Sequence, residues 1–266
     1  MKTSSSDNNY YPKFCEVAAN DSKIFDEFRN HPVYKGVVET VSESDGLDYL
    51  NKSFKLNPKL KDSLFKFCTN EYVGKPKVFN YRKSFFGKSF KISGTTSRYI
   101  KNLSDLIDLF GDLDGLNIAE IGGGYGGLCK IISNQFNFKS YTLFDLPPCL
   151  KLSRRFLEYF NVKNVYYKTE NNINENECFD LVISNYAFSE LNRNLQDIYY
   201  NNILTKSKFG YLTCNFHTHT WDSNQMTEID FSTFENLKVF KDINYLGNID
   251  VMCGVILITW RNSEEL

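Results

Sequence analysis

The chain has 266 residues, 42% of them hydrophobic, and its 31 basic residues nearly balance 32 acidic ones. This composition indicates a packed core, and a net charge of −1 disfavours a broad basic surface, so we expect no nucleic-acid partner. Seven cysteines show no zinc-ligand spacing, and the longest apolar run, 251–260, is about half the ~20 residues of a membrane-spanning helix. We therefore expect an intracellular, cytoplasmic protein with no bound metal and no membrane contact.

The first 112 residues are predicted to form a mainly helical cap that binds the acceptor, placed before a second domain at 113–266. Residues 1–20 are polar, and we expect them to be frayed or loosely docked. Candidate helices lie near 22–29, 58–70 and 97–111. The last of these carries apolar residues at 3.6-residue spacing and stops at Gly111, and its surplus apolar surface suggests a homodimer.

The segment 72–90 is both aromatic and basic. Such a mixture stacks bases and binds diphosphates, as a nucleotide-sugar acceptor requires, but it is equally typical of a buried segment with solvated lysines.

From residue 116 onward the pattern alternates between strands and helices. Strands are predicted at 116–122, 140–146, 165–170, 179–188, 210–216, 237–243 and 251–260, and helices at 127–136, 148–160 and 193–205. The alternation indicates a parallel sheet covered on both faces. The last two strands are joined by seven residues, too few for a parallel crossover, so they should form an antiparallel hairpin. Five parallel strands with such a hairpin are typical of the Rossmann-like class I methyltransferases, an α/β fold.

The stretch AEIGGGYGGL (119–128) fits two glycine-rich cofactor loops, that of NAD enzymes and that of S-adenosylmethionine (SAM) methyltransferases. Glu120 favours SAM, because NAD loops normally carry an apolar residue at this core-facing position. A buried carboxylate needs a partner, which the cationic methionine moiety or backbone amides can supply.

Further cofactor contacts are predicted where successive strands end. Asp145 should accept hydrogen bonds from the ribose hydroxyls, and Leu146 should pack on adenine. The remaining expected cofactor contacts are Gly122, Gly123, Gly124 and Gly126 in the loop, Thr169 and Glu170 after the third strand, and Asn185 and Tyr186 after the fourth. Because no proline pair follows the fourth strand, the sequence disfavours methylation of a nucleobase amino group.

The motifs EIGGGYGGLCKII, YTLFDLPPCLKLSRRFLEYF, DLVISNYAFSELNRNLQDIYYNNIL and SGTTSRYIKNLSDLIDLFG resemble those of the sugar O-methyltransferase family over residues 93–216. The resemblance implies transfer of a methyl group from SAM to a hydroxyl of a sugar, nucleotide sugar or glycan precursor, with S-adenosylhomocysteine (SAH) as product. Arg98 and Tyr99 match the family's RY pair, and we expect them to reach the acceptor or the methionine carboxylate.

A sugar hydroxyl needs a base to accept its proton during the transfer. His217 follows the fifth strand directly and is the predicted base, with His219 in reserve and Asp222 to orient either histidine. Glu190 matches the family motif and is expected to assist the base or contact the sugar, or to serve as base itself.

Two alternatives stay open. A phenol-methylating enzyme would share the DLP second strand and need less help from a base. A methyltransferase-like binding module without activity is disfavoured by the intact Glu120, glycine loop and Asp145.

Overall fold

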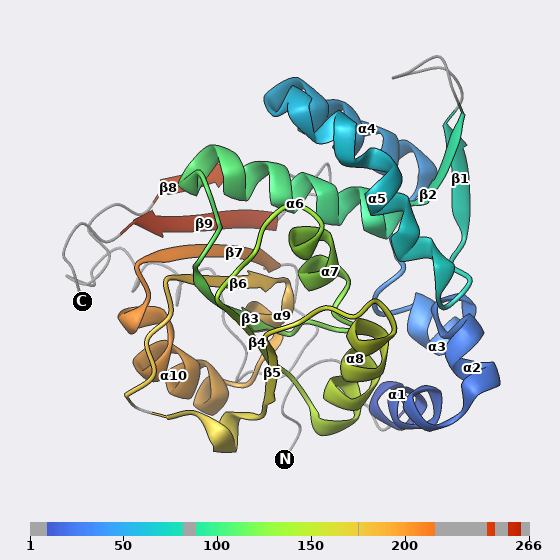
Figure 1. The fold of residues 1–266 in the computed structure, drawn as a ribbon. Coiled ribbons are helices and arrows are strands. Elements are labelled where there is room, and N and C mark those ends of the chain that lie inside the picture. The colour runs from blue at the N-terminus through green and yellow to red at the C-terminus, as the bar shows by residue number, and fades with distance from the viewer. Residues whose placement is uncertain (1–9, 82–88, 175, 216–243, 248–254, 262–266) are drawn as a thin grey trace.

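The computed structural model describes residues 10–81, 89–174, 176–215, 244–247 and 255–261. A seven-stranded sheet lies at its centre, in the order β5-β4-β3-β6-β7-β9-β8 (Figure 1). The strands are β3 (Asn117–Ile121), β4 (Ser140–Phe144), β5 (Val165–Lys168), β6 (Leu181–Asn185), β7 (Phe209–Asn215), β8 (Asn244–Gly247) and β9 (Val255–Arg261). The first five are parallel, and β9 runs antiparallel between β7 and β8. This is the predicted Rossmann-like methyltransferase sheet.

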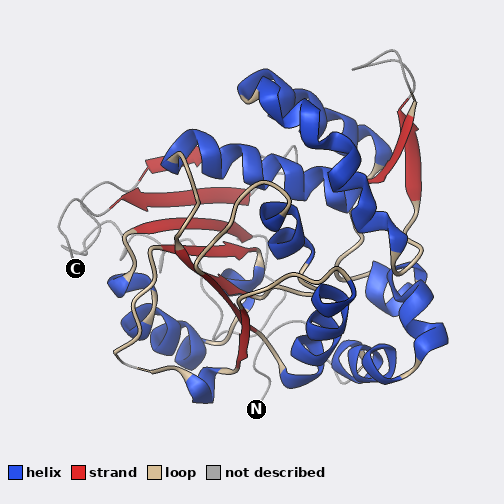
Figure 2. Ribbon diagram, in the orientation of Figure 1, coloured by secondary structure: helices blue, strands red, loops and turns tan. Residues whose placement is uncertain are grey.

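Helices cover both faces of the sheet. Side chains point alternately to opposite faces along each strand, so neighbouring residues enter different core clusters. Ile118 of β3 packs into the larger core cluster, together with residues of α6 (Gly94–Phe110), α7 (Gly127–Ser133) and α8 (Pro147–Tyr159). Ala119, its neighbour, packs into a second cluster with residues of α9 (Ala187–Glu190), α10 (Arg193–Asn202) and the 3₁₀ helix η5 (Leu204–Lys206). Figure 2 shows these helices on the two sides of the strands.

Local signals fix where several of these helices begin. Ser93 caps α6, its side chain accepting a hydrogen bond from the Thr96 amide at 3.1 Å, so the helix starts earlier than the predicted residue 97. Pro147 opens α8, where a missing amide hydrogen costs nothing. Gly126 precedes α7 with a φ of 82°, a conformation that favours glycine.

The N-terminal region consists of short helices and one hairpin. Its elements are α1 (Tyr11–Asn20), α2 (Ser22–Glu27), η1 (Phe28–Asn30), α3 (Pro32–Lys35), α4 (Glu43–Leu56), η2 (Pro58–Ser63), α5 (Leu64–Cys68), η3 (Thr69–Tyr72), and the strands β1 (Val78–Tyr81) and β2 (Phe90–Ser93). They share the larger core cluster with the sheet, and α4 lies along α6 (Figure 1).

Several predictions for this region are wrong. Residues 11–20 are not frayed: they form α1, which packs on α8 and buries Cys15 and Ala18. The helix predicted at 58–70 is three short segments, η2, α5 and η3, and α1, α3, α4 and the hairpin were not anticipated. Gly46 lies inside α4, where a glycine disfavours the prediction of a helix. The fold requires glycine there, because a Cβ would lie 2.7 Å from the Tyr81 hydroxyl.

The C-terminal strand pair is antiparallel, as predicted, but the described part of its first strand lies in the predicted connection. Residues 244–247, expected in the connection, form β8, whereas the predicted strand at 237–243 lies outside the described residues.

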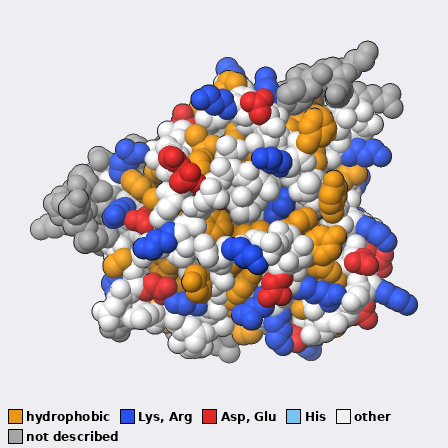
Figure 3. Space-filling view, viewed as in Figure 1, with side chains coloured by type: hydrophobic (Ala, Val, Ile, Leu, Met, Phe, Trp, Pro, Cys, Tyr) orange, Lys and Arg blue, Asp and Glu red, His pale blue; other side chains and the backbone are white. Residues whose placement is uncertain are grey.

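The apolar stripe of α6, predicted to offer surface for a homodimer, is covered within the chain. Ile100, Leu103 and Leu106 are fully buried, and α4 and α7 contact the helix. The homodimer therefore stays a prediction without this surface to support it. Within the described ranges, no helix is both long and apolar enough to cross a bilayer. Figure 3 shows basic and acidic side chains interspersed over the face turned to the viewer.

Candidate active site

A cavity of about 610 Å³ opens at the carboxyl ends of β3, β4 and β6. In an open parallel sheet, this is the edge at which ligands bind. The N-terminal region supplies the opposite wall from Tyr11, residues 37–49 and the start of α6. The cavity is thus enclosed jointly by the sheet and by elements that precede it in the chain.

Most predicted site residues within the described part of the chain line this cavity. They are Arg98, Tyr99, Glu120, Gly122, Gly123, Gly124, Asp145, Leu146, Glu170, Asn185, Tyr186 and Glu190. Two others do not line it: Gly126 packs on Leu157, and Thr169 caps the short helix η4 (Glu170–Asn172). His217, His219 and Asp222 lie outside the described residues.

The glycine loop passes close to its surroundings and leaves little room for side chains. A Cβ on Gly122, where φ is 77°, would lie 2.0 Å from the Ala187 Cβ, and one on Gly123 would lie 2.3 Å from Leu143 Cδ2. At Gly124, by contrast, the nearest atom to such a Cβ is the Tyr34 hydroxyl, 4.0 Å away. The backbone at Gly124 therefore faces open space, where a ligand can approach it.

Asp145 holds this loop from the end of β4. Its carboxylate accepts hydrogen bonds from the Gly124 amide at 3.0 Å and from the Leu146 amide at 2.7 Å. Burial raises the pKa of Asp145 to about 6, although these two amides favour the ionised form. A carboxylate has about four acceptor positions, so lone pairs remain for ligand hydroxyls.

Glu120 is buried on β3 beside the loop. It accepts a hydrogen bond from the Tyr141 hydroxyl at 2.7 Å. Burial raises its pKa to about 7; the tyrosine opposes this rise, and the nearby Asp145 adds to it. Neither Glu120 nor Asp145 forms an ion pair with a Lys or Arg of the described chain. The cavity therefore contains one buried acid, Glu120, and one half-buried acid, Asp145, and a cationic ligand would favour the ionised form of both.

Tyr125 anchors the glycine loop to the N-terminal region. Its buried hydroxyl accepts a hydrogen bond from Asn70 Nδ2 at 3.1 Å, and the Arg29 guanidinium carbon lies 4.7 Å from the ring centroid. Arg29 is fully buried and paired with Glu39 at 2.6 Å and Glu71 at 3.0 Å. The loop is thus fixed from the sheet by Asp145 and from the N-terminal region by this ion-paired cluster.

The end of β6 brings Asn185 and Tyr186 to the cavity. Tyr186 adopts a left-handed conformation, with φ at 67°, and the Arg98 guanidinium carbon lies 5.3 Å from its ring centroid. Asn185 Nδ2 and Arg98 Nε are both buried without a hydrogen-bond partner in the described chain. The unused donor of Arg98, a residue that lines the cavity, indicates a ligand atom that accepts a hydrogen bond.

Sequence reasoning missed two walls of the cavity. One combines Leu191, Leu195 and Tyr199 from the α9–α10 region. The other comprises Val37, Val38, Thr40, Val41, Asp45 and Tyr49, with Val255 from β9. No motif marks either wall, because their residues come from segments that only the fold brings together. None of the described residues of the aromatic and basic segment 72–90 lines the cavity.

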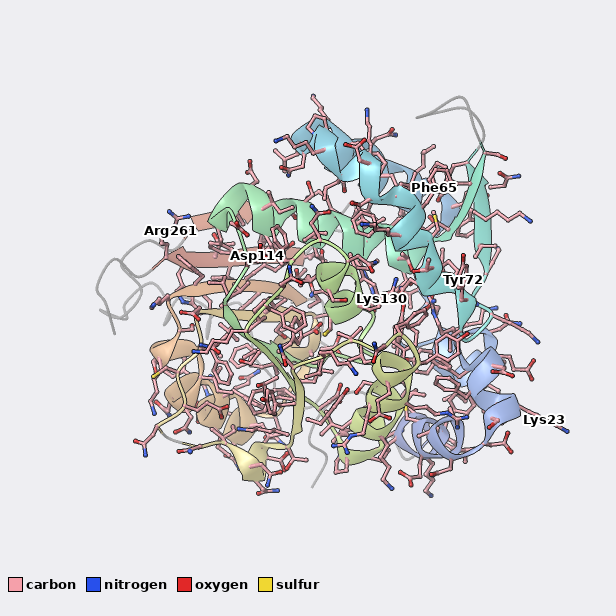
Figure 4. All side chains as sticks on the ribbon, in the orientation of Figure 1. Lys23, Phe65, Tyr72, Asp114, Lys130 and Arg261 are labelled. Carbon is pink, nitrogen blue, oxygen red and sulfur yellow. The ribbon has the colours of Figure 1, made fainter. Side chains whose placement is uncertain are left out.

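A second cavity, of about 590 Å³, lies between η3, α7 and the end of α8. It is lined by Tyr72 and by Lys130, both labelled in Figure 4. The Lys130 ammonium is held by the Lys66 carbonyl at 3.2 Å and by the Thr69 hydroxyl, and burial lowers its pKa to about 8. In the part of the chain that the structure describes, no group of three His, Cys, Asp or Glu residues is arranged to hold a metal.

No family model and no curated protein matches the chain. Solved structures with a similar fold include the methyltransferase domain of bacterial CtHen1 (13% identity, 62% of this chain, 97% of that one, TM-score 0.45). An rRNA methylase of Streptococcus thermophilus matches at 12% identity over 57% of this chain and 90% of its own, with a TM-score of 0.43. A Streptococcus mutans protein in complex with SAH matches at 18% identity over 57% of this chain and 91% of its own, also at 0.43. These similarities concern the methyltransferase fold alone.

Proposed function

We propose that the protein is a SAM-dependent O-methyltransferase whose acceptor is a sugar hydroxyl. One observation carries the choice of cofactor: the glycine loop lies beside the buried Glu120 and the half-buried Asp145, with no cation of the described chain paired to either. NAD would bring an anionic pyrophosphate to this loop, whereas SAM brings a sulfonium and an ammonium group. Moreover, the Gly124 amide, which a pyrophosphate would use, already donates to Asp145.

The lining residues divide naturally between the parts of SAM. Asp145 would accept hydrogen bonds from the ribose hydroxyls, and Leu146 with Leu191 and Leu195 would pack on adenine. Glu120 would favour the ammonium group, and the unused donor of Arg98 would bind the methionine carboxylate. When bound, SAM supplies an electrophilic methyl group, and the protein's task is to hold the acceptor oxygen in line with it.

The proton of the acceptor hydroxyl must pass to a base as the new bond forms. Of the two candidate bases, Glu190 lines the cavity, and His217 stays a prediction. The described lining carries five carboxylates (Asp45, Glu120, Asp145, Glu170 and Glu190) and a single cation, Arg98. This charge favours a sugar without a diphosphate over a nucleotide sugar, because the phosphates would lie among carboxylates.

The apolar wall favours a second candidate function, methylation of a phenol. Val37, Val38, Val41 and Val255 present hydrocarbon to the cavity beside the Tyr49 ring. An aromatic acceptor would bury more apolar surface there than a sugar, and a phenol needs less help from a base.

The direct test is incubation with labelled SAM and a panel of free sugars, nucleotide sugars and phenols, with products identified by a mass gain of one CH₂. Methylation of a free sugar or glycan precursor is the expected result. Exclusive methylation of phenols would favour the second candidate, and failure to bind SAM by calorimetry would refute the cofactor assignment.

A further inference from the structure

The second cavity lies at the opposite edge of the sheet from the candidate active site. Asn137 and Phe138, which line it, come just before β4, and Asn164 directly precedes β5, so it opens at the amino ends of these strands. Among the described residues, none lines both cavities. Its volume of about 590 Å³ is typical of a pocket that holds one small molecule. The second cavity is therefore a separate candidate site.

The two cavities differ in charge. The described lining of the first carries five carboxylates and one cation, whereas that of the second carries Lys130 and Lys163 and no acidic side chain. Lys163 is exposed, but Lys130 is only 3% exposed. Because the charged part of this lining is basic throughout, the second cavity favours an anionic ligand.

Lys130 is a buried cation without a counter-ion in the described chain. Its ammonium donates to the Lys66 carbonyl at 3.2 Å and to the Thr69 hydroxyl, and it lies 4.9 Å from the centroid of the Phe160 ring. Within the described ranges, no carboxylate pairs with it, and the nearby Glu71 is bound to an arginine instead. An ammonium has three hydrogens, and the described chain accepts two of them. A ligand anion can accept the third and balance the buried charge.

Aromatic rings line the same cavity. Tyr72, on η3, and Tyr159, at the end of α8, come from different walls and are 72% and 60% exposed. Three further rings of the lining belong to Phe136, Phe138 and Phe160. Exposed rings beside cations are typical of sites that stack a base and bind its phosphate.

We propose that the second cavity binds a nucleoside phosphate, with the base against the exposed tyrosines and the phosphate at Lys130 and Lys163. The ligand matches the lining, because its base has two apolar faces and its phosphate is anionic. The volume suits a single nucleotide rather than a nucleic-acid strand, for which the nearly neutral chain also lacks charge. This site goes beyond the proposed methyl transfer and does not depend on it.

Calorimetric titration with uridine monophosphate (UMP), in excess SAH so that the first cavity is filled, tests the proposal. UMP should bind at least tenfold more tightly than uridine or inorganic phosphate, because only UMP uses both the rings and the lysines. Lys130→Met, Lys163→Met and Tyr72→Ala should each weaken UMP at least fivefold. Because Lys163 is exposed, its variant tests the charge without disturbing the core. Lys23→Met (Figure 4) and Tyr166→Ala, both exposed and outside the lining, are the matched controls and should bind UMP as wild type does.

Proton uptake gives a second readout, which a purely structural lysine would not change. Burial lowers the pKa of Lys130 to about 8, although Glu71 and Cys68 favour the ammonium form. At pH 8 about half of the Lys130 side chains are neutral, so UMP binding should take up about half a proton. Lys130→Met should take up none. Calorimetry in two buffers of different ionisation enthalpy measures this uptake.

Several results would overturn the proposal. Uridine or inorganic phosphate binding to wild type as tightly as UMP would do so, as would UMP affinity that the lysine variants leave unchanged. Tighter binding of a short oligouridylate than of UMP would assign the cavity to a nucleic acid, and weaker UMP binding by Asp145→Ala would place UMP in the first cavity. If UMP bound as expected but SAH did not bind, the proposed function would be refuted and this site would stand.

Discussion

The molecule buries charge in two places, and the two are organised in opposite ways. In the N-terminal region, Arg29 is fully buried and satisfied by two carboxylates and by Asn70, Ser93 and Thr96. In the cavity, the buried Glu120 and the half-buried Asp145 have neutral donors only, and their pKa values rise to about 7 and about 6. The first cluster is complete within the chain, whereas in the described chain the second has no cationic partner.

This difference distinguishes charged residues that stabilise the fold from charged residues expected to bind a ligand. Removing one partner of a buried ion pair is strongly destabilising, because the other charge is left buried without a partner. Buried acids with raised pKa values instead reduce the stability of the empty protein near neutral pH, a cost that is expected where a ligand must be bound. The two clusters meet at Tyr125, which Arg29 contacts on one side and which belongs to the glycine loop.

Removing the charge of Arg29 should have the largest effect on stability. Arg29→Met leaves Glu39 and Glu71 buried without a counter-ion, so we expect a loss of about 3–5 kcal/mol in unfolding free energy. Urea denaturation measures this loss. Lys151→Met, which removes an exposed pair with Glu16, is the control and should cost about 1 kcal/mol or less. If both variants lost a similarly small unfolding free energy, the Arg29 cluster would not be important for stability.

Asp145→Ala should act on the cofactor more than on the fold. Charge-assisted hydrogen bonds contribute about 1.5–3 kcal/mol each, so losing those to the ribose should weaken SAM at least tenfold by calorimetry. Asp145→Asn retains one acceptor oxygen, so its affinity for SAM should lie between that of the alanine variant and that of wild type. Unchanged SAM affinity in both variants would place the ribose elsewhere.

Glu120→Gln should separate stability from binding. In the empty protein, the folded state keeps a proton on Glu120 that the unfolded state releases near pH 4.5, so stability falls as pH rises from there to about 7. The full loss corresponds to about 3 kcal/mol. The glutamine variant should therefore melt at a higher temperature than wild type at pH 8, yet bind SAM more weakly. A lower melting temperature at that pH would contradict the assignment.

The smallest of the four effects is expected at Arg98. Arg98→Met should weaken SAH about tenfold to a hundredfold, which corresponds to one charged hydrogen bond of about 1.5–3 kcal/mol. Binding of 5′-methylthioadenosine, which lacks the carboxylate, should change by less than about twofold, while Arg98→Lys should recover part of the SAH affinity. An equal loss of affinity for both ligands would show that Arg98 has a structural role. Unchanged affinity for both would indicate that Arg98 contacts the acceptor instead of the cofactor.

The cofactor half of the cavity was predictable from sequence because its signals are local. Glu120, Gly122–Gly124 and Asp145 follow buried strands at fixed spacing, and parallel strands bring their carboxyl ends to one edge. The sheet was predictable for the same reason, since a short connection forces the last two strands to be antiparallel.

The acceptor half was not predictable, since it depends on contacts between distant segments. Tyr49 reaches the cavity from α4, which lies along α6, and Val41 reaches it from the residues just before α4; neither position carries a motif. The Asn185 side chain likewise meets that of Asn102, 83 positions earlier in the chain. Hydrophobic periodicity identified α6, but it could not reveal which polar residue of that helix would meet β6.

The central claim is that the two acids of the cavity, Glu120 and Asp145, bind a cationic cofactor. It is tested most directly by measuring SAM affinity by calorimetry as a function of pH. Ionised Glu120 and Asp145 should bind SAM best, so affinity should rise at least tenfold between pH 5.5 and 7.5, as their pKa values of about 7 and about 6 require. Glu120→Gln should flatten most of this dependence, and NAD should not bind. Binding of NAD without SAM, or SAM affinity that does not change with pH in wild type, would contradict the account.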